Sequence, residues 1–259
     1  MSVRLTPAQR ATAAKYGKPV LVMAHRGIPV RFPENTMRSF REATALDIDI
    51  IEFDVRSSAD GRLIVIHDPA VDRTTNGKGT VHEKTFALLS ELDAGSWKDA
   101  SFSGERIPTL DETYGLFKPL TNIMMNVEIK SADEYTARGA IEMAKQYGII
   151  ERCVFTSFDA RLLAYMRSLD KRVRTQGFPR HCMSNFTDDS FSSMDIVGIP
   201  AGCATYELMC WYADHKIEHG VWCIDDAKNA VAMAERGACI ITSNDPLVVI
   251  DALKAGGYR

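Results

Sequence analysis

Short apolar runs alternate with longer amphipathic segments along most of this chain. A run that is apolar at every position is typical of a parallel β-strand covered on both faces, whereas apolar residues three or four apart indicate a helix. The runs predict strands at residues 19–24, 49–55, 122–129, 153–156, 172–176, 194–199, 220–223 and 239–242. The segments between them predict helices, including one that begins after Asn35 as its N-cap, one at 132–147 and one at 206–219.

Eight strand–helix units in a chain of 259 residues favour a closed (β/α)8 barrel, or TIM barrel. The alternative, an open doubly wound sheet, usually has a glycine-rich turn after its first strand. The sequence His25-Arg26-Gly27-Ile28-Pro29 does not have that spacing. We therefore expect an α/β fold in which residues 1–259 form a single barrel domain.

One stretch after the second strand, residues 56–108, interrupts the alternation. It starts with a hairpin signal at Asp60-Gly61 and a short strand at 63–66, and continues through polar loops with one short helix near 86–92. We expect a small insertion over one end of the barrel, too short to hold a core of its own.

Composition and charge narrow the range of partners. The net charge is −3 and basic residues are spread along the chain, so nothing indicates a nucleic acid or an anionic membrane surface as a partner. No apolar run reaches the roughly 18–20 residues of a membrane span, and residues 1–18 lack the apolar centre of a signal peptide, which favours a cytoplasmic protein. Six cysteines without a C-x-x-C pair indicate reduced thiols, and the sequence leaves a homo-oligomer open.

Two carboxylates, Glu52 and Asp54, stand two positions apart near the end of the second strand. Side chains alternate along a strand, so both leave on one face, where their charges repel and burial is unfavourable. Glu128 ends another strand, and the carboxyl ends of barrel strands meet at one face. Each acid alone could pair with a base such as Arg26 or Lys130. Three converging oxygen ligands instead predict one divalent metal ion, Mg²⁺ or Ca²⁺ rather than zinc.

Two histidines, His25 and His67, each follow an apolar run and would lie at the same face. An imidazole titrates near neutral pH, so one ring can accept a proton while the other donates one. Arg26 and Lys130 would supply cationic donors for an anionic substrate such as a phosphodiester, and they would also offset the three acids.

Two aromatic residues, Phe158 and Trp222, also fall at strand ends. The pattern leaves open whether they belong to the core or wall a pocket for a leaving alcohol. The remaining histidines fall in predicted helices or loops, and we expect them at the surface: His82, His181, His215 and His219.

Taken in order, the motifs resemble those of the glycerophosphodiester phosphodiesterases. They cover nearly the whole chain: His25-Arg26-Gly27, Pro33-Glu34-Asn35-Thr36, Glu52-Phe53-Asp54-Val55, Asp60-Gly61, His67-Asp68, Arg73-Thr74-Thr75, Asn126-Val127-Glu128-Ile129-Lys130, Ser157-Phe158, Trp222 and Ile240-Ile241-Thr242. One departure is Trp222-Cys223-Ile224-Asp225, where the family usually has Trp-Thr-Val-Asn.

The resemblance implies a (β/α)8 barrel with a small insertion after the second strand. It implies hydrolysis of a small-molecule glycerophosphodiester to glycerol 3-phosphate and an alcohol. The implied roles are metal ligation by Glu52, Asp54 and Glu128, and acid–base catalysis by His25 and His67. They also include contacts to the substrate phosphate from Arg26 and Lys130.

Three other functions remain open on the sequence alone. A related barrel phosphodiesterase could act on lysophospholipids or phosphoinositides, and would need an apolar entrance for acyl chains. A non-catalytic barrel could bind phosphoesters, although binding alone requires no pair of histidines. A metal-dependent lyase or isomerase could use the same fold, because a fold does not determine a reaction.

Overall fold

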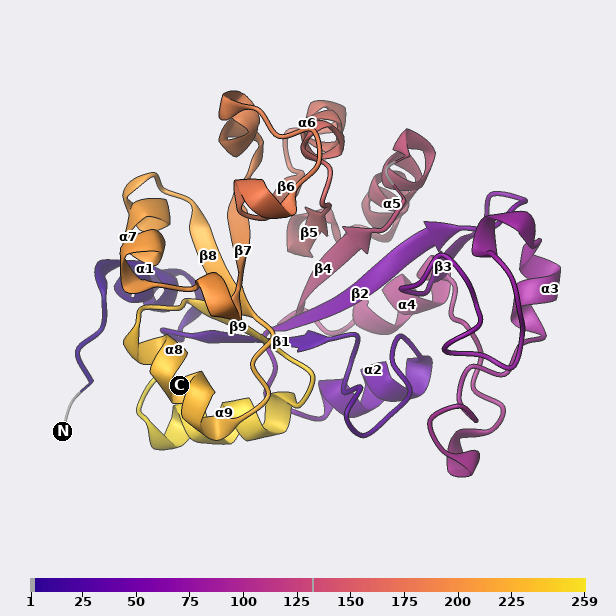
Figure 1. Ribbon diagram of the computed structural model, residues 1–259, viewed down its shortest axis with the longest axis horizontal. Coiled ribbons are helices and arrows are strands. Elements are labelled where there is room, and N and C mark those ends of the chain that lie inside the picture. The colour runs from indigo at the N-terminus through magenta and orange to yellow at the C-terminus, as the bar shows by residue number, and fades with distance from the viewer. Residues whose placement is uncertain (1–2, 132) are drawn as a thin grey trace.

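The computed structural model describes residues 3–131 and 133–259, and its centre is a ring of eight parallel strands (Figure 1). The strands are β1 (Leu21–His25), β2 (Ile50–Ser57), β4 (Met124–Ile129), β5 (Cys153–Thr156), β6 (Arg174–Gly177), β7 (Ile196–Pro200), β8 (Glu218–Trp222) and β9 (Ile240–Ser243). Each strand pairs with the next, and β1 pairs with both β2 and β9, which closes the ring. The predicted (β/α)8 barrel is therefore confirmed.

Helices surround this ring on its outside. They are α2 (Met37–Thr44), α4 (Leu110–Phe117), α5 (Glu134–Tyr147), α6 (Ala160–Leu169), α7 (Tyr206–Asp214), α8 (Ala227–Glu235) and α9 (Pro246–Ala255). The outward side chains of the strands pack against them. On β2, for example, Phe53 and Val55 join the main hydrophobic cluster, and the Phe53 ring stacks on Phe117 of α4 with 6.3 Å between centroids. Packing therefore orients β2 so that Glu52 and Asp54, which alternate with these two residues, face the inside of the barrel.

One further helix, α1 (Pro7–Tyr16), lies at the end of the barrel where the strands begin. A capping box between Thr6 and Gln9 starts it, and the buried Gln9 amide donates to the Ala234 and Ala238 carbonyls. Tyr16 packs against the apolar side chains that fill the inside of the barrel at this end. The hydrophobic pattern had indicated no helix here.

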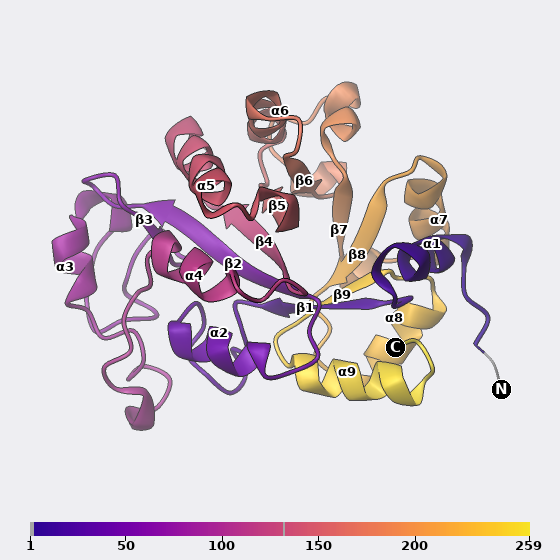
Figure 2. The ribbon, with the colours of Figure 1, turned by 180° about the vertical axis from the view of Figure 1, so that it is seen from behind.

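The insertion lies at the opposite end of the long axis from α1, as both views show (Figure 1, Figure 2). Its first strand, β3 (Leu63–Val65), runs antiparallel to β2 after a turn in which Gly61 takes a φ of +79°. The short helix α3 (Phe86–Ser90) follows. This region has a small hydrophobic cluster of its own, so the expectation of no separate core was wrong: Ile64, Ile66, Val71, Val81, Leu89, Ala94 and Ile107.

Two local predictions were also wrong. Thr36, not Asn35, caps α2, because the Asn35 side chain donates to Asp54 instead and its backbone has a φ of +56°. The predicted helix at 206–219 ends at Asp214, and His219 belongs to β8, where it is buried rather than exposed. Residue 132, the predicted start of α5, lies outside the described residues.

Two expectations from composition can be compared with the structure. Among residues 3–131 and 133–259, no helix combines the length and apolarity needed to cross a membrane. All six cysteines are free thiols.

Candidate active site

Three acidic side chains meet inside the barrel, at the end where the strands finish. The strand register places Glu128 of β4 beside Asp54 of β2. One carboxylate oxygen from each of Glu52, Asp54 and Glu128, the acid cluster, lies within 4.8 Å of the others, and all three side chains are buried. The spacing of two along β2 and the parallel register thus bring together three acids that are distant in sequence.

Two cations lie against the acid cluster. Arg26 Nε is 3.1 Å from Asp54 Oδ2, and Lys130 Nζ is 3.1 Å from Asp54 Oδ1. Lys130 also donates to Glu128. Arg26 has a left-handed backbone with a φ of +54°, which directs its amide N–H to Glu52 Oε2 at 2.9 Å. This conformation costs a non-glycine residue about 1–2 kcal/mol, so the surrounding contacts must hold it in place.

Burial and these neighbours shift the pKa values of the acids in different directions. Burial raises the pKa of Glu52, and the nearby Asp54 and Glu128 charges raise it further. Burial would also raise the pKa of Asp54, but Lys130 and Arg26 outweigh it and lower the value to about 2. Burial raises the pKa of Glu128 despite Lys130. The two cations therefore stabilise the charge of Asp54 more than that of Glu52.

The acid cluster fits a divalent cation on chemical grounds. Its donors are carboxylate oxygens, which Mg²⁺ and Ca²⁺ prefer. Glu52 Oε1 is buried and accepts no hydrogen bond from the described part of the chain. A buried carboxylate oxygen without a partner is costly, and a cation among the three acids would satisfy it.

Two histidines lie in the same pocket as the acid cluster. His25 ends β1, and its Nε2 lies 3.9 Å from Glu52 Oε2. His67 follows β3, and its Nδ1 lies 2.6 Å from Asp68 Oδ1. Burial lowers the pKa of His67, and the charge of Asp54 opposes that shift.

A cavity of about 250 Å³ opens above the acid cluster. Aromatic rings form one wall, where Phe158 stacks on Phe178 with 3.7 Å between centroids and Trp222 stands edge-on to Phe178 at 5.7 Å. Trp222 Nε1 is buried without a hydrogen-bond partner among the described residues. Phe158 and Trp222 therefore line the pocket, which the sequence pattern had left open.

Comparison with known proteins identifies the family. The sequence profile of the glycerophosphoryl diester phosphodiesterase family matches residues 25–191. A glycerophosphodiester phosphodiesterase of Caldanaerobacter subterraneus subsp. tengcongensis is 32% identical over 251 residues, covering 92% of this chain and 99% of the relative. The chain belongs to the glycerophosphoryl diester phosphodiesterase family. A glycerophosphodiester phosphodiesterase of Bacillus subtilis is 30% identical over 221 residues, covering 78% of this chain and 75% of the relative.

Solved structures of the family agree with this fold. An Oleispira antarctica phosphodiesterase, solved in complex with the product sn-glycerol-3-phosphate, superposes with a TM-score of 0.83. It is 26% identical, and the match covers 90% of this chain and 96% of that one. Together with the relatives, this makes the chain an enzyme that acts on glycerophosphodiesters.

The structure brings all nine predicted site residues of this phosphodiesterase together. Eight line the cavity: His25, Arg26, Glu52, His67, Glu128, Lys130, Phe158 and Trp222. Asp54, which the structure fully buries, completes the acid cluster beneath them.

Several residues that contact this site had no predicted role. Arg73, from the insertion, donates to both Glu34 and Asp68, and Glu34 also accepts from Arg26 at 2.9 Å. These ion pairs connect His67, through Asp68, to Arg26. Glu34, Asp68 and Arg73 lie in the motifs quoted above, so those motifs could have indicated that they belong to the site. Phe178 lies in none of these motifs, and nothing in the sequence indicated its place.

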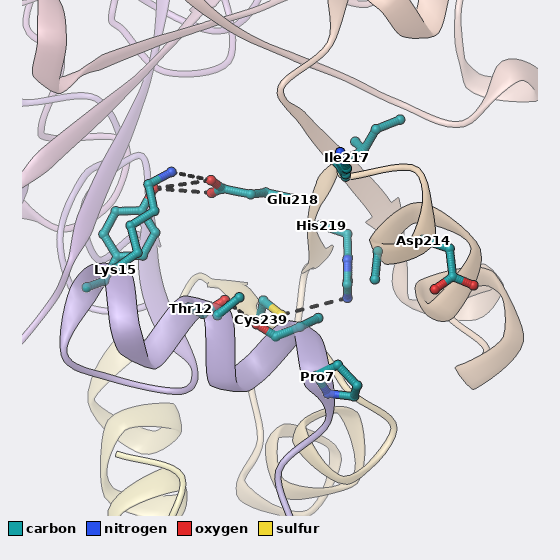
Figure 3. Close-up of a pocket in the computed structure, with 13 residues that line it drawn as sticks. Pro7, Thr12, Lys15, Asp214, Ile217, Glu218, His219 and Cys239 are labelled. Carbon is teal, nitrogen blue, oxygen red and sulfur yellow. Dashed lines mark hydrogen bonds and ion pairs between the residues drawn. The ribbon is translucent and has the colours of Figure 1, made fainter.

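A second cavity, of about 360 Å³, lies at the other end of the barrel between α1 and the segment leading into β8 (Figure 3). It contains the buried His219, whose Nε2 lies 3.2 Å from the Gly237 carbonyl oxygen, and the Cys239 thiol. Among the described residues, no group of three metal-binding side chains gathers there. This cavity is larger, but it lacks the chemistry that phosphodiester cleavage needs.

Proposed function

We propose that the enzyme cleaves glycerophosphodiesters by acid–base catalysis with His25 and His67, assisted by one Mg²⁺ or Ca²⁺ ion held by Glu52, Asp54 and Glu128. The observation that carries this proposal is that both histidines line the same small cavity as Glu52 and Glu128 of the acid cluster. Binding alone would not require two imidazoles at that position. The product bound to the Oleispira antarctica relative, sn-glycerol-3-phosphate, supports a substrate of this class.

Glu52, Asp54 and Glu128 would hold a divalent ion, which would supply positive charge toward the phosphodiester oxygens. The chain itself provides Arg26 and Lys130, whose cationic groups reach the cavity and are now paired with the acids. With substrate bound, Arg26 and Lys130 would also donate hydrogen bonds to the phosphate oxygens. Negative charge on these oxygens increases in the transition state, so the two cations would stabilise it.

The histidines divide the proton transfers. The glycerol hydroxyl next to the phosphate attacks phosphorus and gives its proton to His25, while His67 protonates the oxygen of the departing alcohol. The products of this step are a cyclic glycerol phosphate and the free alcohol. Water then opens the ring with the two roles reversed, which leaves glycerol 3-phosphate and restores both histidines.

The aromatic wall provides the remaining contacts. Phe158, Phe178 and Trp222 would pack against the apolar carbons of the substrate, and Trp222 Nε1 would donate to one of its oxygens. A wall of this kind orients the diester so that the attacked phosphorus faces the histidines.

The test is release of glycerol 3-phosphate by metal-stripped enzyme, with Mg²⁺ or Ca²⁺ added back. Glycerophosphocholine should be cleaved and lysophosphatidylcholine should not. We expect His25→Ala and His67→Ala each to lower kcat by about 100-fold or more, because an acid–base group typically contributes that much. His215→Ala is the matched control, because His215 is exposed and stacks on Trp211 outside the cavity. Full activity in EDTA would refute the metal requirement, and wild-type kcat in either histidine variant would exclude that residue.

A further inference from the structure

The segment that follows β9 contacts the His25 ring through the side chain of Asn244. Its Nδ1 lies 2.7 Å from Asn244 Oδ1. Its Nε2 points to the other side, toward Glu52 in the cavity. The two ring nitrogens therefore have different environments: one contacts a side-chain amide, and the other faces the acid cluster.

Asp225 determines which end of that amide faces His25. Its carboxylate accepts from the Asn244 backbone N–H at 2.6 Å and from Asn244 Nδ2 at 2.8 Å. A carboxylate only accepts hydrogen bonds, so the amide must direct its NH₂ group to Asp225 and its oxygen to His25. An oxygen in that position accepts, and the donor has to be a proton on His25 Nδ1.

The position of this proton determines the tautomer of the neutral ring. With Nδ1 protonated and bonded to Asn244, the lone pair of neutral His25 is on Nε2, the nitrogen that faces the cavity. We propose that Asn244 and Asp225 are positioning residues that keep His25 in this tautomer and orientation. The inference rests on the proposed catalytic role of His25.

One other group could compete for His25 Nδ1. The Cys223 sulfur lies 3.7 Å from it, but a thiol sulfur is a weak acceptor and the amide oxygen is 1 Å closer. Asp225 also accepts from Ser243 Oγ at 3.1 Å, so a simpler role in shaping the turn must be distinguished by experiment.

The first variants remove each contact in turn. Asn244→Ala should lower kcat by about 10- to 100-fold with little change in KM, since Asn244 does not line the cavity and partners that orient a functional imidazole contribute that much. Asp225→Asn should lower kcat in the same direction, because an amide at 225 no longer determines which way Asn244 faces. Asp225 is exposed, so this variant should fold normally.

The exchanged double variant, Asp225→Asn with Asn244→Asp, provides the rescue. It puts a carboxylate at position 244, where it accepts from His25, and an amide at position 225, where it donates to that carboxylate. The kcat of the double variant should therefore be higher than that of Asp225→Asn and that of Asn244→Asp. The control is Asn229→Ala. Asn229 makes the same two-point contact with Asp226, at 2.9 and 2.7 Å, but in α8 and without a histidine. This variant should keep wild-type kcat.

A spectroscopic measurement separates positioning from turn structure. The ring ¹⁵N shifts of His25 in metal-free wild-type enzyme should show a protonated Nδ1 and an unprotonated Nε2 at a pH where the ring is neutral. Asn244→Ala should show a mixture of tautomers. In a His25→Ala background, Asn244→Ala should lower kcat no further.

The outcomes distinguish this inference from the proposed function. If His25→Ala keeps wild-type kcat, the catalytic role of His25 is lost and this inference with it. If His25→Ala is impaired while Asn244→Ala keeps wild-type kcat and ring shifts, the positioning role alone is refuted. Should Asn244→Ala fail to fold, the exchanged variant decides, and a kcat no higher than that of Asp225→Asn overturns the inference.

Discussion

The acid cluster should destabilise the metal-free protein, and replacing Glu52 with glutamine tests this. Glutamine has nearly the same shape, and its side-chain oxygen can still accept from the Arg26 backbone N–H. The substitution therefore removes a charge and little packing. We expect Glu52→Gln to increase the free energy of unfolding of the metal-free protein at neutral pH.

The size of the effect follows from the geometry. Two unit charges 4.8 Å apart repel by about 3.5 kcal/mol at an effective dielectric constant of about 20. Glu52 has two such neighbours, Asp54 and Glu128, and Arg26 and Lys130 offset part of this repulsion. A net gain of about 1–4 kcal/mol is typical when a buried charge is replaced by a neutral group of similar volume.

Chemical denaturation, with and without saturating Mg²⁺ or Ca²⁺, is the assay. A ligand that binds only the folded state stabilises it, so the ion should stabilise the wild type more than Glu52→Gln. The variant should thus be the more stable protein without the ion and should lose that advantage when the ion is added. If metal-free Glu52→Gln is less stable than the wild type, the reasoning about uncompensated charge is wrong.

Glu34→Gln is the matched control, because the same substitution should have the opposite sign. Glu34 accepts from Arg26 at 2.9 Å and from Arg73 at 2.8 Å. Burial would raise its pKa, but the hydrogen bonds and charges of these two guanidinium groups lower it. Glu34→Gln removes the charge that both guanidinium groups share, although Asp54 and Asp68 still pair with them, so we expect a loss of about 2–4 kcal/mol with or without the ion.

The effects of both substitutions should also depend on pH, although the underlying pKa shifts have opposite directions. The folded-state pKa of Glu34 lies below its usual value near 4.5, so its stabilising contribution is present above pH 4.5 and is lost as the pH falls through the folded-state value. The pKa of Glu52 is raised, so in the metal-free wild type stability is lost as the pH rises through its folded-state value. The effect of Glu34→Gln should disappear in acid, and so should that of Glu52→Gln.

Two further predictions concern Gly27, which follows Arg26, and Phe178 of the aromatic wall. Gly27→Ala should lower the free energy of unfolding by at least about 3 kcal/mol in chemical denaturation, because Gly27 has a φ of +89° and a Cβ there would lie 2.1 Å from Ser39 Oγ. Gly104→Ala, where φ is +92° and a Cβ meets nothing within 4 Å, should cost only about 1–2 kcal/mol, and equal losses would contradict the steric argument. Phe178→Leu should lower kcat/KM by about 3- to 10-fold, the usual value of an aromatic contact. Phe186→Leu, outside the cavity, should leave kcat/KM unchanged, and equal kcat/KM in both variants would remove Phe178 from the substrate wall.

The acid cluster could be predicted from sequence because it depends on local periodicity and on one rule of the fold. Alternation along β2 places Glu52 and Asp54 on one face, and a barrel brings the end of β4 beside them. The contacts of Asp68 and Asn244 could not be predicted in this way, because they depend on loop conformations that leave no periodic signal in the sequence.

His219 shows the same limit. The apolar spacing from residue 206 onward continues past the true end of α7 at Asp214. The chain leaves the helix where Lys216 takes a φ of +60°, a left-handed conformation that usually requires glycine or asparagine. Without such a residue the sequence does not mark the helix end, so the strand was predicted to begin at residue 220 instead of at Glu218, and the buried His219 was assigned to the helix.

The insertion divides the proposed catalytic pair between two hydrophobic units. His25 belongs to the barrel, whereas the segment before His67 is shared. Leu63 and Val65 of β3 pack into the main core, but Ile64 and Ile66 pack into the small cluster of the insertion. A region held by fewer buried contacts opens at lower cost than the main core. Moderate denaturant or heat should therefore separate the two histidines while the barrel is still folded, and the enzyme would lose activity before it loses its helical signal.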